Sequence, residues 1–303
     1  MKGMHGIIFS YEKKTGLREL IEHRIHGSVP IGGEYRVVDF MLSNMVNAGV
    51  QDVGIIMQGK CQSMLDHLSN GKSWDLSRKH GGLTLLPAFA YAENRGGIGK
   101  FRGKVEALAC VLDYLVEDVR QDYVVLADSD LVINIPLDDV LRDHMASGAD
   151  MTCVCTSLPG ESSDTYFKLD DTGRIIDTAY DVYAPEGYRS LNLYILATDL
   201  LIRLVRDCMA HNQYSFRPIF CRIWAISCSC AAMCGTAMPP ASARCRITMS
   251  AAWSCCAATS APSSSAPTAP SMPRRTTPAP LISTPAASAS TPSSLTAAIS
   301  RAA

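Results

Sequence analysis

The chain has 303 residues, with 28 Lys+Arg, 29 Asp+Glu and a formal net charge of −1 at pH 7. All 29 acidic residues lie within residues 1–220, whose formal charge is −7, so nucleic acid is excluded as the expected partner. Residues 221–303 contain no Asp, Glu or Lys, yet they hold 10 of the 16 prolines and 7 of the 12 cysteines. Because no single domain has this split, we expect an ordered domain over residues 1–217 and a separate tail over residues 218–303.

The start of the chain has no basic segment followed by an apolar one, and no apolar stretch reaches the ~18 residues of a membrane span. We therefore expect a cytoplasmic chain with no membrane partner. The cysteines before residue 221 are odd in number and scattered through apolar runs, which favours reduced, buried thiols. They are Cys61, Cys110, Cys153, Cys155 and Cys208. A metal site at Cys153 and Cys155 lacks a second pair of ligands, so core packing is favoured there.

Strand-like and helix-like segments alternate along the front of the chain. The strand-like runs are residues 6–9, 53–57, 123–127, 151–156 and 191–197, and the helical patterns are residues 37–48, 61–68, 104–116 and 137–147. This alternation predicts an α/β fold whose Rossmann-like, mostly parallel sheet has helices on both faces. Ligands bind such sheets beyond the carboxyl ends of the strands, so we expect residues 10–16, 58–60 and 128–130 on one rim.

Four sequence blocks follow one another over the first 216 residues. The most specific block contains Y-R-x-x-D-F-x-L-S-N, within SVPIGGEYRVVDFMLSNMVNAGV, and the later blocks are GKFRGKVEAL, YFKLDDTGRI and SLNLYIL. In content and order they resemble glucose-1-phosphate adenylyltransferases (ADP-glucose pyrophosphorylases), and more narrowly the D-type regulatory subunit of glycogen biosynthesis. The resemblance implies a nucleotidyltransferase fold and a reaction in which ATP and glucose 1-phosphate give ADP-glucose and pyrophosphate, with Mg²⁺.

The segment after the first strand departs from the glycine-rich loop of that family. The pattern G-G-x-G-T-R-L falls on residues 11–17, where all three glycines are missing and Gly16 replaces the arginine. Tyr11 and Glu12 would obstruct the close backbone approach that a triphosphate needs. We expect that this loop does not bind ATP in the usual way. The nucleotide-binding candidates that remain are Lys13, Lys14, Thr15 and Arg18.

The catalytic and metal positions that the resemblance implies are altered as well. His26 replaces a phosphate-facing lysine, and a histidine is shorter and mostly neutral at pH 7. The metal-binding aspartate of L-S-G-D-H falls on Ser129, with Asp128 and Asp130 on either side. These two carboxylates are the candidates for holding Mg²⁺ if the protein is active, while a solvated acidic turn is the favoured interpretation. By this resemblance, altered equivalents of the family's catalytic residues are present at four positions: His26, Asp128, Ser129 and Asp130.

The sugar-phosphate region keeps part of the family pattern. The motif G-T-A-D-A aligns with residues 103–107, so Gly103 and an acidic residue, Glu106, are retained, while Lys104 replaces a small hydroxyl residue. Asn192, in the block SLNLYIL, completes the sugar-phosphate candidates.

The scaffold block at residues 35–44 is nearly intact, in contrast to the altered site. Its charged residues, Arg36 and Asp39, either contact a ligand or pair within the scaffold, because residues three apart on a helix are neighbours. Substitutions that fall at the catalytic and binding positions, while the scaffold residues are retained, are typical of a pseudoenzyme.

The tail has the composition that a GC-rich gene gives when it is read out of frame. Synonymous codons for residues 291–301 can be chosen so that the same bases, read one base earlier, encode NSLIADGCNIEG. This peptide resembles the first coil of the family's left-handed β-helix. The same shift can turn residues 218–230 into DILQNMGDQLQL and residues 249–264 into YERSMELLRGDVRAEL. We therefore expect a frameshift close to residues 216–218, either a sequencing error or a true lesion, rather than a genuine disordered linker. Translated as written, the tail is expected to be disordered and the β-helix to be missing.

Two functions remain open, and they differ in whether the chain is an enzyme. The first is a regulatory or stabilising, catalytically weak subunit in a hetero-oligomer with a catalytic ADP-glucose pyrophosphorylase subunit. Its effector would be a sugar phosphate or a nucleotide. The alternative is an active glucose-1-phosphate adenylyltransferase that uses Lys13, Lys14 and Asp128 or Asp130 in rebuilt roles. A truncated chain that neither assembles nor catalyses is a third interpretation.

Overall fold

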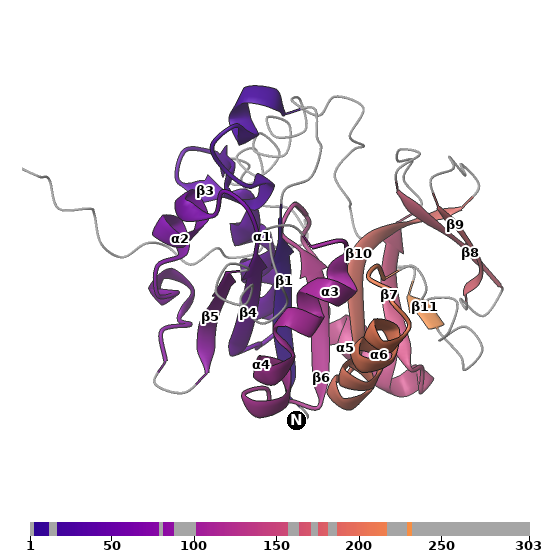
Figure 1. Ribbon diagram of the computed structural model, residues 1–303. Helices are drawn as coiled ribbons and strands as arrows, with labels where there is room; N and C mark the ends of the chain where they lie inside the picture. The colour runs from indigo at the N-terminus through magenta and orange to yellow at the C-terminus, as the bar shows by residue number, and fades with distance from the viewer. Residues whose placement is uncertain are drawn as a thin grey trace, which may run out of the picture. The chain divides into compact units, whose positions relative to one another are not determined.

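A buried strand, β1 (Met4–Ser10), lies inside the central sheet (Figure 1). The computed structural model describes residues 3–11, 17–78, 81–87, 101–156, 164–170, 175–180, 187–216 and 229–231. Parallel strands flank β1 on both sides, β4 (Asp52–Met57) on one and β6 (Tyr123–Asp128) on the other. All three strands consist largely of buried apolar residues, as is typical of a parallel sheet covered on both faces.

The sheet continues beyond these three strands in both directions. The order of its main path is β11-β7-β10-β6-β1-β4-β5, with β8 paired to β10 and β9 paired to β8. The outer strands are β5 (Gly82–Pro87), β7 (Met151–Thr156), β8 (Thr165–Leu169), β9 (Ile175–Tyr180), β10 (Tyr188–Ala197) and β11 (Ser229–Ala231). Strand β10 runs antiparallel to β6, β7 and β8, so the sheet is mixed, with a parallel β6-β1-β4-β5 portion.

Helices cover both faces of the sheet, as predicted. One hydrophobic core lies under α1 (Val37–Asn47), α2 (Gln62–Leu68) and α5 (Leu137–Ser147). The other lies under α3 (Lys104–Cys110), α4 (Leu112–Glu117) and α6 (Thr198–Ala210), which face the viewer in Figure 1. Successive residues of β1 alternate between the cores: Ile8 packs in the first, and Ile7 and Phe9 pack in the second.

Several short elements lie before α1 or after α2 in the chain, and a few residues in or beside them belong to a third, smaller core. These elements are η1 (Arg18–Ile21), η2 (His26–Ser28), β2 (Pro30–Ile31), β3 (Tyr35–Arg36) and η3 (Lys72–Trp74). Strands β2 and β3 pair as an antiparallel ribbon, and Val29, Ile31 and Phe40 are buried in this core. Through these contacts the β2-β3 ribbon is packed against the start of α1.

Three features differ from the sequence-based expectation. The helix expected over residues 104–116 is two helices, because Val111 leaves helical geometry with φ −106° and ψ 23°. Helix α6 was not predicted, although its buried Leu201, Val205 and Cys208 recur at helical spacing. Within the range predicted as a tail, β11 pairs in parallel with β7, whereas residues 217–228 and 232–303 lie outside the described residues.

The five cysteines before residue 221 are free thiols. Cys153 and Cys155 of β7 are fully buried in the same hydrophobic core, which confirms the expectation of core packing for this pair. In the described part of the chain, no helix is both long and apolar enough to cross a membrane.

Candidate functional site

The carboxyl ends of β1, β4 and β6 meet at one rim of the sheet. The backbone N–H of Gln58 donates to the carbonyl of Ser10 at 3.0 Å, and the N–H of Ser129 donates to the carbonyl of Phe9 at 2.9 Å. The hydroxyl of Ser129 also donates to that of Ser10, at 2.9 Å. The prediction that these three segments share a rim is therefore confirmed for its described residues. Since β4 and β6 lie on opposite sides of β1, this rim is where the strand order reverses, the usual ligand site of such sheets.

A buried ion pair lies at the end of β6. The Nζ of Lys104 is 2.8 Å from Oδ1 of Asp128, and the two side chains are only 10% and 2% exposed. Lys104 is the first residue of α3, where the helix dipole disfavours a cation, so the carboxylate of Asp128 compensates an unfavourable position. Removing either partner would leave an uncompensated buried charge, which typically costs about 3–5 kcal/mol.

Two aromatic rings enclose the same ammonium group. Its Nζ lies 5.3 Å from the ring centroid of Phe9 and 5.5 Å from that of Tyr194. Both distances are within the range of cation–π attraction. Phe9, Asp128 and Tyr194 come from β1, β6 and β10, which are adjacent strands, so the enclosure is part of the sheet itself.

The turn after β6 contains two further catalytic candidates, Ser129 and Asp130. Ser129 is 3% exposed and bonded to Ser10, as described above. Asp130 faces His26, with 3.7 Å between Oδ2 and Nδ1. Gly27 lets η2 approach this turn closely, because an added Cβ would lie 2.8 Å from the Cβ of Ser129. The structure thus brings Asp128, Ser129 and Asp130 to one rim, as the sequence predicts, and it adds His26 beside Asp130.

Magnesium is the ion that the family resemblance implies, and the residues of this turn do not fit it. Asp128 is paired with a lysine, Ser129 contributes a buried hydroxyl, and Asp130 lies opposite His26. Across the described ranges, no three His, Cys, Asp or Glu residues gather closely enough to hold a metal ion.

The acidic sugar-phosphate candidate, Glu106, binds a neighbouring arginine. Its Oε1 lies 2.6 Å from the guanidinium of Arg102, and its Oε2 accepts the backbone N–H of Arg102 at 2.6 Å. This hydrogen bonding raises the pKa of Arg102, whose guanidinium also stacks 3.3 Å over the ring of Tyr214. The carboxylate of Glu106 therefore forms part of a local ion pair at the start of α3.

The segment before Phe216 covers the start of α3. The carbonyl of Tyr214 accepts the N–H groups of Val105 and Glu106, at 3.1 and 3.3 Å. Gly103 permits this approach, because an added Cβ would overlap the Tyr214 carbonyl and would lie 2.8 Å from the Cα of Ser215. The first amide groups of the helix are thus satisfied within the chain.

Asn192 lies at an irregularity in β10. It has φ 54°, and the register with β7 shifts between Ser190 and Leu193. The side-chain carbonyl of Asn192 accepts the hydroxyl of Tyr194 at 3.0 Å, and Tyr194 stacks on Phe216 at 5.3 Å. Asn192 therefore orients one of the rings that enclose Lys104. Of the nucleotide-binding candidates, Lys13, Lys14 and Thr15 lie outside the described residues, and only the backbone of Arg18 is described, in η1.

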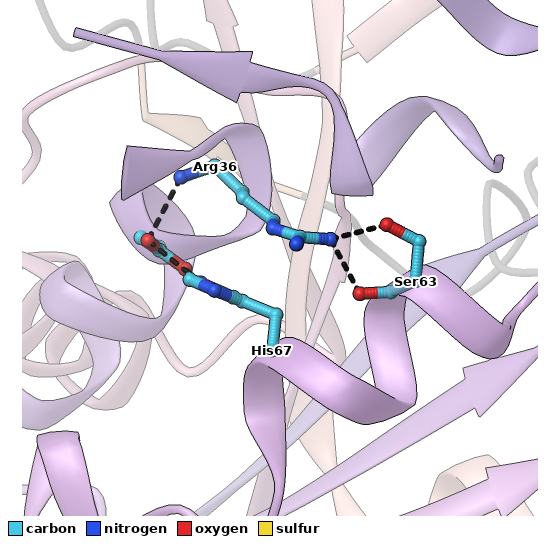
Figure 2. Close-up of polar contacts among 4 residues, drawn as sticks. Arg36, Ser63 and His67 are labelled. Carbon is cyan, nitrogen blue, oxygen red and sulfur yellow. Dashed lines mark hydrogen bonds and ion pairs between the residues drawn. The ribbon is translucent and has the colours of Figure 1, made fainter. Parts of the chain in front are cut away.

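The charged residues of the scaffold block hold α1 against α2 (Figure 2). The Arg36 guanidinium donates to the carbonyl and hydroxyl of Ser63. Asp39 accepts the backbone N–H of Arg36 at 2.9 Å and lies 2.8 Å from Nε2 of His67. Both residues therefore make contacts within the scaffold, and the link from Arg36 to Asp39 is a hydrogen bond from the backbone of Arg36. Ser63 and His67 were missed from sequence, and their spacing of four on α2 was the available signal.

The model of the family described as nucleotidyl transferase matches residues 7–179, more than half of the chain. The chain, with its mixed α/β sheet and a rim where the strand order reverses, belongs to this nucleotidyltransferase family.

Two relatives are named "Glycogen biosynthesis protein GlgD". The one from Geobacillus stearothermophilus is 33% identical over 216 residues, which cover 70% of this chain and 52% of the relative. The one from Bacillus subtilis is 35% identical over 188 residues, 62% of this chain and 52% of the relative. A "Glucose-1-phosphate adenylyltransferase" from Pseudothermotoga lettingae is 32% identical over 212 residues, 68% of this chain and 47% of the relative. The chain thus spans about half the length of the relatives it matches.

Proposed function

We propose that this chain is a regulatory or stabilising subunit of ADP-glucose pyrophosphorylase in glycogen biosynthesis, with little catalytic activity of its own. The names of the relatives support the pathway, since they combine glycogen biosynthesis with glucose-1-phosphate adenylyl transfer. Identities of 32–35% to relatives of both names do not separate a regulatory from a catalytic role. The argument for one role over the other therefore has to come from the residues of the site.

The observation that carries the proposal is the buried pair of Lys104 and Asp128. Adenylyl transfer brings the phosphate of glucose 1-phosphate to the α-phosphate of ATP, and both groups are anionic. Catalysis of such a reaction needs cationic groups or metal ions directed at the phosphates. Here the lysine that faces the end of β6 is paired with a carboxylate of the same chain, and the neighbouring hydroxyl of Ser129 is bonded to Ser10.

A second candidate is an active glucose-1-phosphate adenylyltransferase, with Mg²⁺ as its cofactor. The observation that favours it is the retained geometry of the rim, where the backbones of Phe9, Ser10, Gln58 and Ser129 are joined by hydrogen bonds. In this case Lys13 and Lys14 would have to replace the lost loop charges, and a carboxylate of the β6 turn would have to be released from its present partner.

We propose a catalytic pyrophosphorylase subunit as the partner, in a hetero-oligomer, and a sugar phosphate or a nucleotide as the effector. We further propose that the reading frame is shifted near residues 216–218, and that the assembly surface lies in the part that the shift removes. A change in effector affinity on mixing would correspond to a coupling free energy of ~1–3 kcal/mol.

Size-exclusion chromatography of three samples tests this role: a catalytic subunit alone, with this chain as written, and with a chain whose frame is restored. The restored chain is expected to shift the catalytic subunit into a mixed oligomer and to alter its turnover or effector affinity. The chain as written is expected to do so poorly. Absence of a mixed oligomer in both mixtures contradicts the subunit role, and equal assembly in both contradicts the assignment of the assembly surface.

A further inference from the structure

The ammonium group of Lys104 occupies a built cation site. Asp128 is its counter-ion, at 2.8 Å, and the rings of Phe9 and Tyr194 lie within 5.5 Å of its Nζ. Three adjacent strands supply these groups, and α3 supplies the lysine. This position is the carboxyl end of β6, at the point where the strand order of the sheet reverses.

The site is also held in place by its surroundings. The hydroxyl of Tyr194 donates to Asn192, and its ring stacks on Phe216. Gly103 allows the Tyr214 carbonyl to bind the first amides of α3, which fixes the helix that carries Lys104. With side-chain exposures of 10% and 2%, the ammonium and the carboxylate have left most of their hydration shells. A long lysine chain fixed in this way acts as a stationary charge rather than as a mobile surface group.

We propose that the Lys104 ammonium is a resident cation that takes the place of a divalent metal ion at the end of β6. The buried carboxylate already has a cation in contact, so a metal ion would have to displace the ammonium and leave it buried without its counter-ion. The rim of this chain therefore does not take up a divalent ion at Asp128 while Lys104 is present. This inference concerns metal binding alone and does not depend on the subunit role proposed above.

The test uses Mn²⁺ as the probe, because the electron paramagnetic resonance signal of free Mn²⁺ reports how much metal is bound without any assay of activity. Four full-length proteins are titrated: wild type, Lys104→Thr, the double variant Lys104→Thr/Asp128→Asn, and Lys168→Thr. Lys168 is an exposed lysine on β8 and serves as the matched control. Removal of the ammonium leaves the Asp128 carboxylate in need of a counter-ion.

Lys104→Thr is expected to bind Mn²⁺ at least tenfold more tightly than wild type, Lys168→Thr or the double variant. Wild type that binds Mn²⁺ as tightly as Lys104→Thr would overturn the proposal, as would a Lys104→Thr affinity no greater than that of the double variant. If Lys104→Thr does not fold, Lys104→Gln, which keeps most of the side-chain volume, replaces it in both variants. A titration of Asp128→Asn alone completes the test, because wild-type Mn²⁺ binding that this single variant abolishes would contradict a resident ammonium.

Discussion

At the residue scale, the buried polar groups of β1 and β6 are stabilised in two different ways. Asp128 is in direct contact with the ammonium group of Lys104. His5, at the other end of β1, is 2% exposed, and burial lowers its pKa to about 4, although the carboxylate of Asp52 partly opposes this shift. Its Nε2 lies 3.2 Å from the hydroxyl of Tyr114, a neutral hydrogen-bond partner. His5 is therefore uncharged in the folded protein at neutral pH.

The burial of His5 predicts a loss of stability in mild acid. An unfolded chain binds a proton at His5 below about pH 6.5, while the folded protein does so only below about pH 4. Between these values the unfolded state binds more protons, so the free energy of unfolding falls as the pH falls. From pH 7 to pH 5 this residue should contribute a loss of about 2 kcal/mol.

Urea unfolding of wild type and His5→Gln at pH 7 and pH 5 measures this contribution. Glutamine does not titrate and retains hydrogen-bonding groups near Tyr114. Burial also lowers the pKa of His144, but this histidine is present in both proteins, and its effect cancels in the comparison. Equal losses of stability in the two proteins would show that His5 is not the group responsible.

At the element scale, α1 is the helix that joins the scaffold block to the rim. Asn44 is 2% exposed, and its side-chain amide donates to the carbonyl of Ile133 at 2.8 Å. Its side-chain carbonyl accepts the N–H of Ile135 at 3.2 Å. Both partners lie in the segment between the β6 turn and α5, so the helix fixes the course of the chain as it leaves the candidate site.

Asn44→Ala is expected to lower the free energy of unfolding by about 2 kcal/mol or more, because it leaves two backbone groups without their partner. The matched control is Asn47→Ala, at the exposed end of the same helix, which should change stability by no more than about 0.5 kcal/mol. Denaturant unfolding of the two variants beside wild type makes the comparison. Similar values for both variants would contradict the role of Asn44 as an anchor.

Much of the element pattern was predictable because it follows from local periodicity. The buried strands β1, β4, β6 and β7 are short apolar runs, and α1 and α5 have helical spacing of apolar residues. The antiparallel direction of β10 and the break at Val111 were not predictable in this way. Both depend on how distant segments pack, which periodicity within one segment does not encode.

At the scale of the whole molecule, the sequence predicted where the site residues lie but not which side chains they contact. The strand-and-helix pattern correctly placed Asp128 and Asp130 on the same rim as Ser10 and Gln58. Lys104 was expected to face a sugar phosphate, yet its ammonium group pairs with the carboxylate of Asp128, which lies 24 positions away in the chain. That pairing arises only when α3 packs over the end of β6. The same applies to Arg36, whose guanidinium binds Ser63 across two elements.

The central claim is that a retained nucleotidyltransferase scaffold has lost its catalytic power, and one assay tests it most directly. The chain with its frame restored is supplied alone with ATP, glucose 1-phosphate and Mg²⁺, and ADP-glucose formation is measured beside a catalytic subunit under the same conditions. We expect negligible ADP-glucose synthesis, with turnover far more than tenfold below that of the catalytic subunit. Turnover within tenfold, a difference of only about 1.4 kcal/mol in the barrier, would contradict the claim and favour an active adenylyltransferase.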